Sequence, residues 1–132
     1  MDLVVDTSVI IAVLTSEPER RALIRLTRGA NLLAPASVHW EVGNALAAMF
    51  KRGRIDAGQI RRVLRAYERI PVRHVEVDLE GALDLAIEHG IYAYDAYVIA
   101  CARGQRCRIV SLDQGLLRVA SAAGVGVLEV KQ

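Results

Sequence analysis

Aromatic side chains and long apolar runs are scarce in this sequence. Phe, Tyr and Trp make up 5% of the 132 residues, whereas 53% are hydrophobic, so aliphatic side chains must supply most of the core. No stretch approaches the roughly 20 unbroken apolar residues that a membrane helix needs, so we expect no membrane association. Asp2 and Asp6 flank the first apolar run and no basic residue precedes it, unlike an export signal. We therefore expect a cytoplasmic protein.

Cysteine is also rare, and the spacing of Cys101 and Cys107 does not match that of a metal site. A pair of buried, reduced thiols is the simplest interpretation and is consistent with the cytoplasm. The sequence also lacks a phosphate-binding glycine motif and a Ser–His pair. Asp6 is not followed two residues later by the second aspartate of a haloacid dehalogenase-type phosphatase, which disfavours an aspartyl-phosphate mechanism.

Positive charge is concentrated in one segment although the net charge is only +2. Between Lys51 and Arg73, eight Lys and Arg residues stand against two acidic residues, a local excess of six positive charges. Such a stripe can contact a phosphate backbone, but it can equally be a solvated helical face. The candidate nucleic-acid contacts are Lys51, Arg52, Arg54, Arg61, Arg62 and Arg65.

Apolar periodicity and capping signals predict strands that alternate with helices. The expected strands are residues 3–5, 32–34, 75–77, 108–112 and 125–130, and the expected helices are 9–14, 18–28, 37–52, 56–69, 79–89, 95–102 and 113–123. One of Asp6, Thr7 and Ser8 should cap the first helix, and Ser37 the third. This order predicts one α/β domain over residues 1–132, with a mainly parallel sheet of about five strands between two helical layers.

Three aspartates fall where parallel strands end or helices begin. Asp6 follows the first strand, Asp113 follows the fourth, and Asp95 begins a helix. Glu41 lies early in the third helix, at the boundary of its apolar stripe. Each acid alone has an ordinary explanation, as a helix cap or a solvated residue. Together they should converge at one edge of the sheet, where clustered carboxylates favour Mg²⁺ or Mn²⁺ over zinc and suit metal-assisted phosphodiester hydrolysis.

Four segments around these acids resemble the motifs of PIN-domain nucleases, in the family's order and over the full chain. They are Val4-Val5-Asp6-Thr7-Ser8-Val9-Ile10, Glu41-Val42-Gly43-Asn44-Ala45-Leu46, Tyr94-Asp95-Ala96-Tyr97-Val98-Ile99-Ala100 and Ser111-Leu112-Asp113-Gln114-Gly115-Leu116. A chain of this length most resembles the VapC-type toxins of toxin–antitoxin pairs. The resemblance implies a PIN-like α/β/α fold and a Mg²⁺- or Mn²⁺-dependent endoribonuclease. It also implies a homodimer held inactive by a small antitoxin.

The same resemblance implies roles for individual residues. Asp6, Glu41, Asp95 and Asp113 match the family's catalytic, metal-binding acids, with Glu41 a candidate proton acceptor. Asn44 and Ser111 match its polar supporting positions, and Thr7 or Ser8 is expected to orient Asp6. Two alternatives stay open: a housekeeping RNA-processing nuclease without an antitoxin, and a catalytically silent PIN-like module that binds RNA or protein.

The aromatic residues beside the motifs are ambiguous. Tyr92, Tyr94 and Tyr97 are expected to pack in the core or at its rim, with stacking on unpaired bases as the alternative. Trp40 is expected to be a core or dimer anchor.

Overall fold

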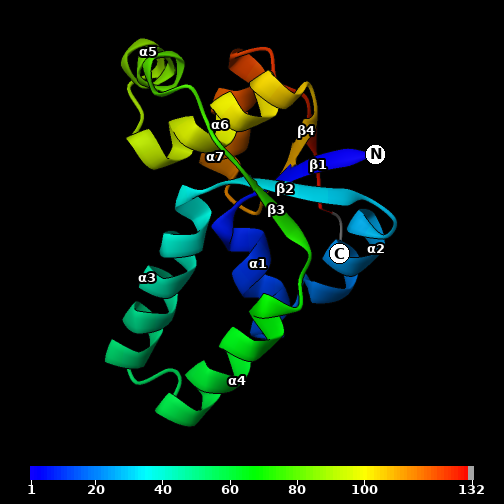
Figure 1. Cartoon of the computed structure of the whole chain (residues 1–132), viewed down its shortest axis with the longest axis vertical. Coiled ribbons are helices and arrows are strands. Elements are labelled where there is room, and N and C mark those ends of the chain that lie inside the picture. The colour runs from blue at the N-terminus through cyan, green and yellow to red at the C-terminus, as the bar shows by residue number, and fades with distance from the viewer. Residues whose placement is uncertain (131–132) are drawn as a thin grey trace.

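Five strands alternate with seven helices in residues 1–130, the part of the chain that the computed structural model describes (Figure 1). The strands are β1 (Asp2–Val5), β2 (Asn31–Pro35), β3 (Val72–Val75), β4 (Arg108–Val110) and β5 (Val127–Leu128). The helices are α1 (Thr7–Leu14), α2 (Arg20–Thr27), α3 (Ser37–Lys51), α4 (Ala57–Glu68), α5 (Leu79–His89), α6 (Ala93–Gln105) and α7 (Gln114–Ala122). Within these residues no helix combines the length and the apolar character needed to cross a bilayer.

The strands form one sheet in the order β3-β2-β1-β4-β5. Every pairing between these described strands is parallel, so all their carboxyl ends lie at the same edge. β1 is central and pairs with both β2 and β4. The predicted mainly parallel, five-stranded sheet is therefore confirmed.

Alternating residues of the central strand enter two different hydrophobic cores. Val4 packs with Ile109 under α5, α6 and α7, whereas Leu3 and Val5 pack against residues of α1, α2, α3 and α4. All of these strand residues are at most 1% exposed. Such complete burial is typical of a parallel sheet covered on both faces. The two cores confirm the predicted three-layer α/β/α arrangement (Figure 1).

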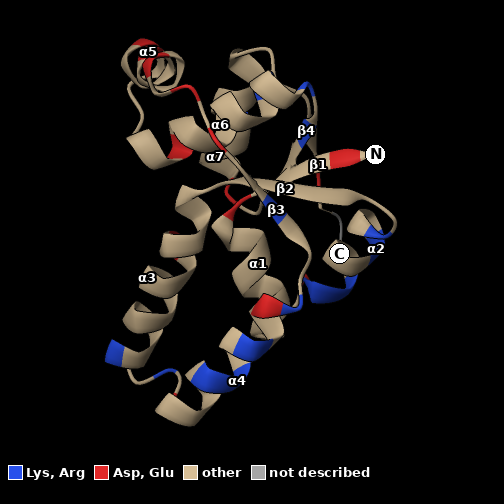
Figure 2. Cartoon of the chain, in the orientation of Figure 1, with Lys and Arg blue, Asp and Glu red and all other residues tan. Residues whose placement is uncertain are grey.

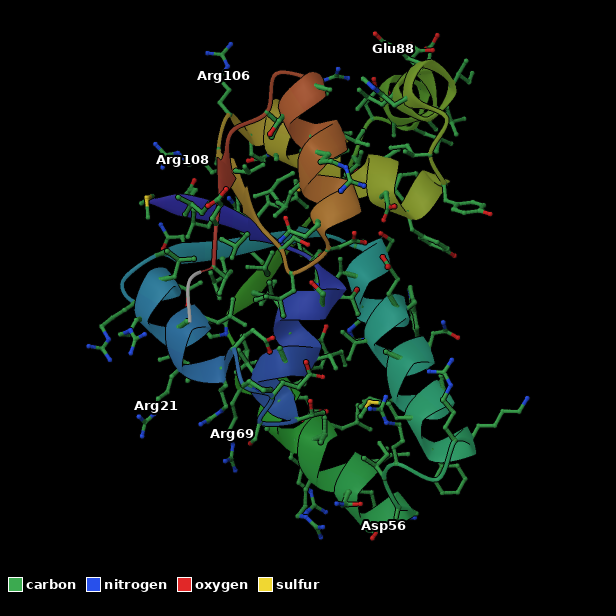
Figure 3. All side chains as sticks on the ribbon, turned by 180° about the vertical axis from the view of Figure 1, so that it is seen from behind. Arg21, Asp56, Arg69, Glu88, Arg106 and Arg108 are labelled. Atoms are coloured by element: carbon green, nitrogen blue, oxygen red, sulfur yellow. The ribbon has the colours of Figure 1, made fainter. Side chains whose placement is uncertain are left out.

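α3 and α4 form a helical hairpin that projects beyond the sheet (Figure 1). α3 leads away from the carboxyl edge, and α4 returns toward β3. Asp56 caps the first turn of α4 by accepting a 2.7 Å hydrogen bond from the Gln59 backbone, while the Gln59 side chain accepts one of 2.8 Å from the Asp56 backbone. Asp56 therefore marks the end of α4 that lies far from the sheet (Figure 3).

The third strand lies earlier than the apolar pattern predicted, and the last two strands are shorter. β3 begins at Val72, three residues before the predicted start, and stops at Val75, which pairs with Pro35, because β2 ends there and offers no further partner to Val77. β4 stops at Val110 instead of continuing to residue 112. The Leu112 backbone N–H is donated to the Ser8 hydroxyl at 3.0 Å, not to a neighbouring strand. β5 covers only two of the residues predicted for the last strand.

Several helix starts also differ from the prediction, since α1 begins at Thr7 instead of residue 9 and α2 begins at Arg20 instead of residue 18. Ser37 was expected to cap α3 but is its first residue, and the capping position is Ala36, which makes no side-chain cap. α6 begins at Ala93, two residues before the predicted start. Asp95 therefore lies inside the first turn of α6, where a carboxylate still faces the positive end of the helix.

Candidate active site

Asp6 stands at the carboxyl end of β1 and caps α1, with both carboxylate oxygens bound. Its Oδ1 accepts hydrogen bonds from the Val9 backbone at 3.3 Å and the Ser8 hydroxyl at 2.6 Å. Its Oδ2 accepts one of 2.6 Å from the Ser111 hydroxyl. The residue is 8% exposed. Burial raises the pKa of Asp6, and these three hydrogen bonds oppose the rise.

Ser8 and Ser111 connect Asp6 to the segment that follows β4. Ser8 Oγ accepts the Leu112 backbone N–H at 3.0 Å, and Ser111 Oγ accepts the Asp113 backbone N–H at 2.9 Å. The two hydroxyl oxygens are 3.4 Å apart. Each hydroxyl therefore accepts a hydrogen bond from the backbone of the β4–α7 connection and donates one to Asp6. These bonds fix the ends of β1 and β4 relative to each other.

Asp113 lies beside this pair as the N-cap of α7. Its Oδ1 accepts a 3.1 Å hydrogen bond from the Leu116 backbone, and the residue is exposed. A Cβ atom at Gly115 would lie 3.2 Å from the same oxygen, so glycine leaves this carboxylate room in the first turn. Asp6 and Asp113 are thus both helix caps, and capping does not prevent an outer lone pair from binding a ligand.

Glu41 approaches from α3 and is only partly exposed. Burial raises the pKa of Glu41, and the nearby charge of Asp6 adds to the rise. The Thr7 and Ser37 hydroxyls lie close enough to oppose it. By hydrogen-bond geometry, however, Glu41 Oε1, Thr7 Oγ1 and Ser37 Oγ are all buried without a partner among the described residues. A buried oxygen without a donor is the kind of atom that a cation satisfies.

Asp95 completes the group from the first turn of α6. Burial raises the pKa of Asp95, and the charge of Asp113 raises it further. The same charge of Asp113 acts on Asp6, and Asp95 acts on Glu41. The four acids at the carboxyl edge of the sheet are therefore linked by repulsion, Asp6 with Asp113 and Glu41, and Asp95 with Asp113 and Glu41.

The donor set fits a hard divalent cation, since every oxygen comes from a carboxylate or a hydroxyl. The acidic side chains lie farther apart than the ligands of an occupied metal site do. Within residues 1–130, no three carboxyl, imidazole or thiol groups are close enough together to ligate one ion. The acids are thus neighbours that repel each other, and a cation among them would relieve the repulsion.

The predicted supporting residues are placed differently from one another. Ser8 and Ser111 contact Asp6 directly, whereas Thr7 lies next to Glu41. Asn44 is exposed on α3, one turn beyond Glu41. The bridges from Ser8 and Ser111 to the β4–α7 connection were not predicted, because they depend on contacts between segments about 100 residues apart.

The basic segment lies away from the acids. Lys51 and the arginines of α4 are exposed on the projecting hairpin (Figure 2). Ten helical residues separate Lys51 from Glu41, a rise of roughly 15 Å along α3. The candidate RNA contacts therefore form a separate basic surface that runs from the tip of the hairpin along α4.

The aromatic residues near the motifs are largely exposed. Trp40 is 76% exposed, Tyr92 86% and Tyr94 57%. Of the two roles expected for Trp40, the core anchor is wrong, because its position on α3 is opposite the buried stripe of Val38 and Val42, whereas the dimer anchor stays a prediction. Tyr97 is partly buried and meets the Tyr94 ring edge-on at 5.9 Å between centroids.

Fold and site together describe a parallel α/β domain with an acidic cluster at the carboxyl edge of its sheet. Residues 3–122 match the PIN domain family, and the chain belongs to this family. The chain is 32% identical to ribonuclease VapC9 of Mycobacterium tuberculosis over 112 residues, which are 84% of this chain and 85% of the relative.

Solved structures show the same fold. PAE2754 from Pyrobaculum aerophilum superposes with a TM-score of 0.72 at 25% identity, covering 96% of this chain and 92% of its own. The Mycobacterium tuberculosis toxin VapC20, described as cleaving the sarcin–ricin loop, superposes with a TM-score of 0.66 at 19% identity, covering 98% and 99%.

Proposed function

We propose that this protein is a Mg²⁺- or Mn²⁺-dependent endoribonuclease and the toxin of a VapBC-type toxin–antitoxin pair. The observation that carries the proposal is the group of four mutually repelling carboxylates at the carboxyl edge of a PIN-domain sheet. Relatives of similar length that are named ribonuclease support the reaction class. The acidic cluster argues against a catalytically silent PIN-like module. Four carboxylates repel the RNA phosphates, so RNA binding at this site needs a cation.

Asp6, Asp95 and Asp113 are the residues that would hold the ion, with Glu41 beside them, and binding would have to draw their side chains closer together than they lie in this structure. Asp6 is kept in one orientation by Ser8 and Ser111, so its remaining lone pairs point in a fixed direction. When bound, the divalent ion supplies charge neutralisation for the phosphate and acidifies water.

Glu41 is the proposed proton acceptor. Its raised pKa, caused by burial and by Asp6, brings it closer to the neutral range where a general base is most effective. Water attacks the phosphorus atom and gives its proton to Glu41. The bond from phosphorus to the leaving ribose oxygen breaks, and that oxygen takes up a proton from solvent water. The Thr7 and Ser37 hydroxyls lie near Glu41 without bonding it in this structure, and a small side-chain shift would let either one donate to its carboxylate.

The partners follow from surfaces outside the acids. RNA several nucleotides from the cut is proposed to contact the basic surface on the α3–α4 hairpin, which consists of Lys51, Arg52, Arg54, Arg61, Arg62 and Arg65.

A homodimer is proposed through α5, where Leu83 and Ile87 are 42% and 81% exposed one turn apart. A small antitoxin is proposed as the inhibitor, by analogy with VapBC2 of Rickettsia felis, which is only 9% identical. Two unpaired cysteines support a reducing, cytoplasmic location.

The test is cleavage of a mixed RNA pool by the purified protein with Mg²⁺, with Mn²⁺ and with EDTA. Cuts that need a divalent ion and disappear in Asp95→Asn support the nuclease. RNA binding without cleavage under either metal would instead favour the silent module. Rescue of cell growth by co-expressing the small protein encoded next to this gene would separate a toxin from a housekeeping nuclease.

A further inference from the structure

A hollow of about 290 Å³ opens beside the acidic cluster. It lies between the start of α3, the β3–α5 connection and the first turns of α6. Its walls include Pro35, Ser37, Glu76, Val77, Leu79 and Tyr97. The volume is at the small end of pockets that hold organic ligands, which run from roughly 300 Å³ upward.

The hollow adjoins the acidic cluster through Ser37. Ser37 borders it and stands one turn before Glu41 on α3, close enough for its hydroxyl to affect that carboxyl group. Tyr97 borders the hollow from α6, the helix that also carries Asp95 in its first turn. A group seated in the hollow would therefore belong to a nucleotide next to a phosphate held by the acids.

The walls suit a flat, largely apolar ring. Val77 and Leu79 present aliphatic surface, and Leu79 is 57% exposed although it is apolar. Tyr97 adds an aromatic ring whose neighbour Tyr94 meets it edge-on. Nucleobases that are not paired bind proteins by stacking on such side chains.

Glu76 is the one feature that opposes simple RNA binding. Its carboxylate is exposed at the hollow and would repel a phosphate placed there. A carboxylate accepts hydrogen bonds only, so it favours a base that presents N–H donors. Guanine offers a ring N–H beside an amino group, which matches the two oxygens of one carboxylate, whereas uracil offers a single N–H.

We propose that this hollow binds one unpaired base of the RNA next to the cut, and that Glu76 makes guanine the preferred base. The proposal rests on the proposed ribonuclease function for its substrate. It assigns Glu76 a part in specificity and none in the chemistry.

Cut sites in a randomised RNA pool, sequenced for the wild type, Glu76→Gln and Glu88→Gln, test the choice of base. Glu88 is an exposed glutamate near the end of α5 and controls for the loss of one negative charge (Figure 3). The wild type should enrich guanine at one position beside the cut. Glu76→Gln should reduce that enrichment roughly tenfold and favour adenine, whose edge an amide matches, whereas Glu88→Gln should keep the wild-type profile.

Binding to the metal-free protein tests the hollow independently of cleavage. Guanosine 5′-monophosphate should shift the backbone NMR signals of residues 75–79 and Tyr97, more strongly than uridine 5′-monophosphate does. Val77→Trp, which fills the hollow, should abolish these shifts.

Shifts without any RNA cleavage would support the base site while the nuclease proposal fails. Cleavage with the same base profile in all variants, and no shifts, would overturn the base site alone. Signals in this region that change on dilution and not with nucleotide would also overturn it, since a second copy would then cover the hollow.

Discussion

Ser111 Oγ donates a 2.6 Å hydrogen bond to Asp6 Oδ2, joining residues that stand 105 positions apart in the sequence. The same hydroxyl accepts the Asp113 backbone N–H, so one serine orients two of the four acids. Because Asp6 is buried at the end of a strand, its direction depends on these contacts more than on solvent.

Ser111→Ala should therefore lower kcat/KM for RNA cleavage by about 10- to 100-fold, as is typical when a residue that orients a metal ligand is lost. It should also destabilise the fold by about 1–3 kcal/mol, since a buried carboxylate oxygen loses its donor. Steady-state cleavage and urea unfolding would measure the two effects. Ser111→Thr, which keeps the hydroxyl, should restore most of both. Ser121→Ala, at an exposed position of α7, is the matched control. Wild-type cleavage by Ser111→Ala would show that this contact has no part in activity.

Neutralising one acid should stabilise the metal-free protein even as it removes activity. The pKa of Glu41 and that of Asp95 are raised in the folded state, by burial and by neighbouring carboxylates. A carboxyl group with a raised folded-state pKa contributes stability below its unfolded pKa of about 4, and that contribution is lost as pH rises through the folded value. At neutral pH in EDTA, Glu41→Gln and Asp95→Asn should thus unfold a few degrees above the wild type.

Thermal unfolding at two pH values checks this explanation. The difference between variant and wild type should shrink as the pH falls toward 4, because protonation removes the same charge in the wild type. Adding Mg²⁺ or Mn²⁺ should raise the unfolding temperature of the wild type more than that of Asp95→Asn. Variants that are less stable than the wild type at pH 7 in EDTA would contradict the mutual repulsion.

The fold was predictable from the sequence because its signals are local. Aliphatic runs, capping aspartates and the glycines after helices mark most elements, and the predicted range 79–89 agrees with α5 at both ends. The parallel sheet follows from strands that are separated by helices. Strand ends were less predictable, because the length of β3 is set by β2 and that of β4 by a hydrogen bond to Ser8.

The site was predictable in outline only. The positions of Asp6 and Glu41 follow from the end of β1 and from the helical wheel of α3. The exposure of Trp40 follows from its place on α3 opposite Val38 and Val42, which the helical wheel could have shown. The hollow beside Glu76 was not predictable, because it depends on how α3, α6 and the β3–α5 connection meet. A charge count could not show that the arginines of α4 lie far from the acids (Figure 2).

Both cysteines should react slowly with thiol reagents in the native state, and Cys101 more slowly than Cys107. Burial raises the pKa of the Cys101 thiol to about 12, and it also raises that of Cys107, which is less buried. A thiol-specific reagent at pH 8 should modify Cys107 slowly and Cys101 only after unfolding, since the thiolate is the reactive form. Mass spectrometry of the labelled peptides would identify the order. Rapid labelling of Cys101 in native buffer would contradict the packing of α6 against the sheet.

The proposed dimer surface on α5 makes a prediction that is separable from folding. Leu83 and Ile87 are exposed in the single chain, so replacing them should cost the monomer little stability. If α5 packs against a second copy, Ile87→Lys should place a charge in that apolar contact and weaken dimerisation by at least tenfold. Sedimentation analysis across a range of concentrations would give the dissociation constants of both proteins. Lys51→Glu, on the distant hairpin, reverses a surface charge without touching α5 and should dimerise like the wild type. An unchanged dimer in Ile87→Lys would move the interface away from α5, and a monomeric wild type would remove the homodimer from the proposal.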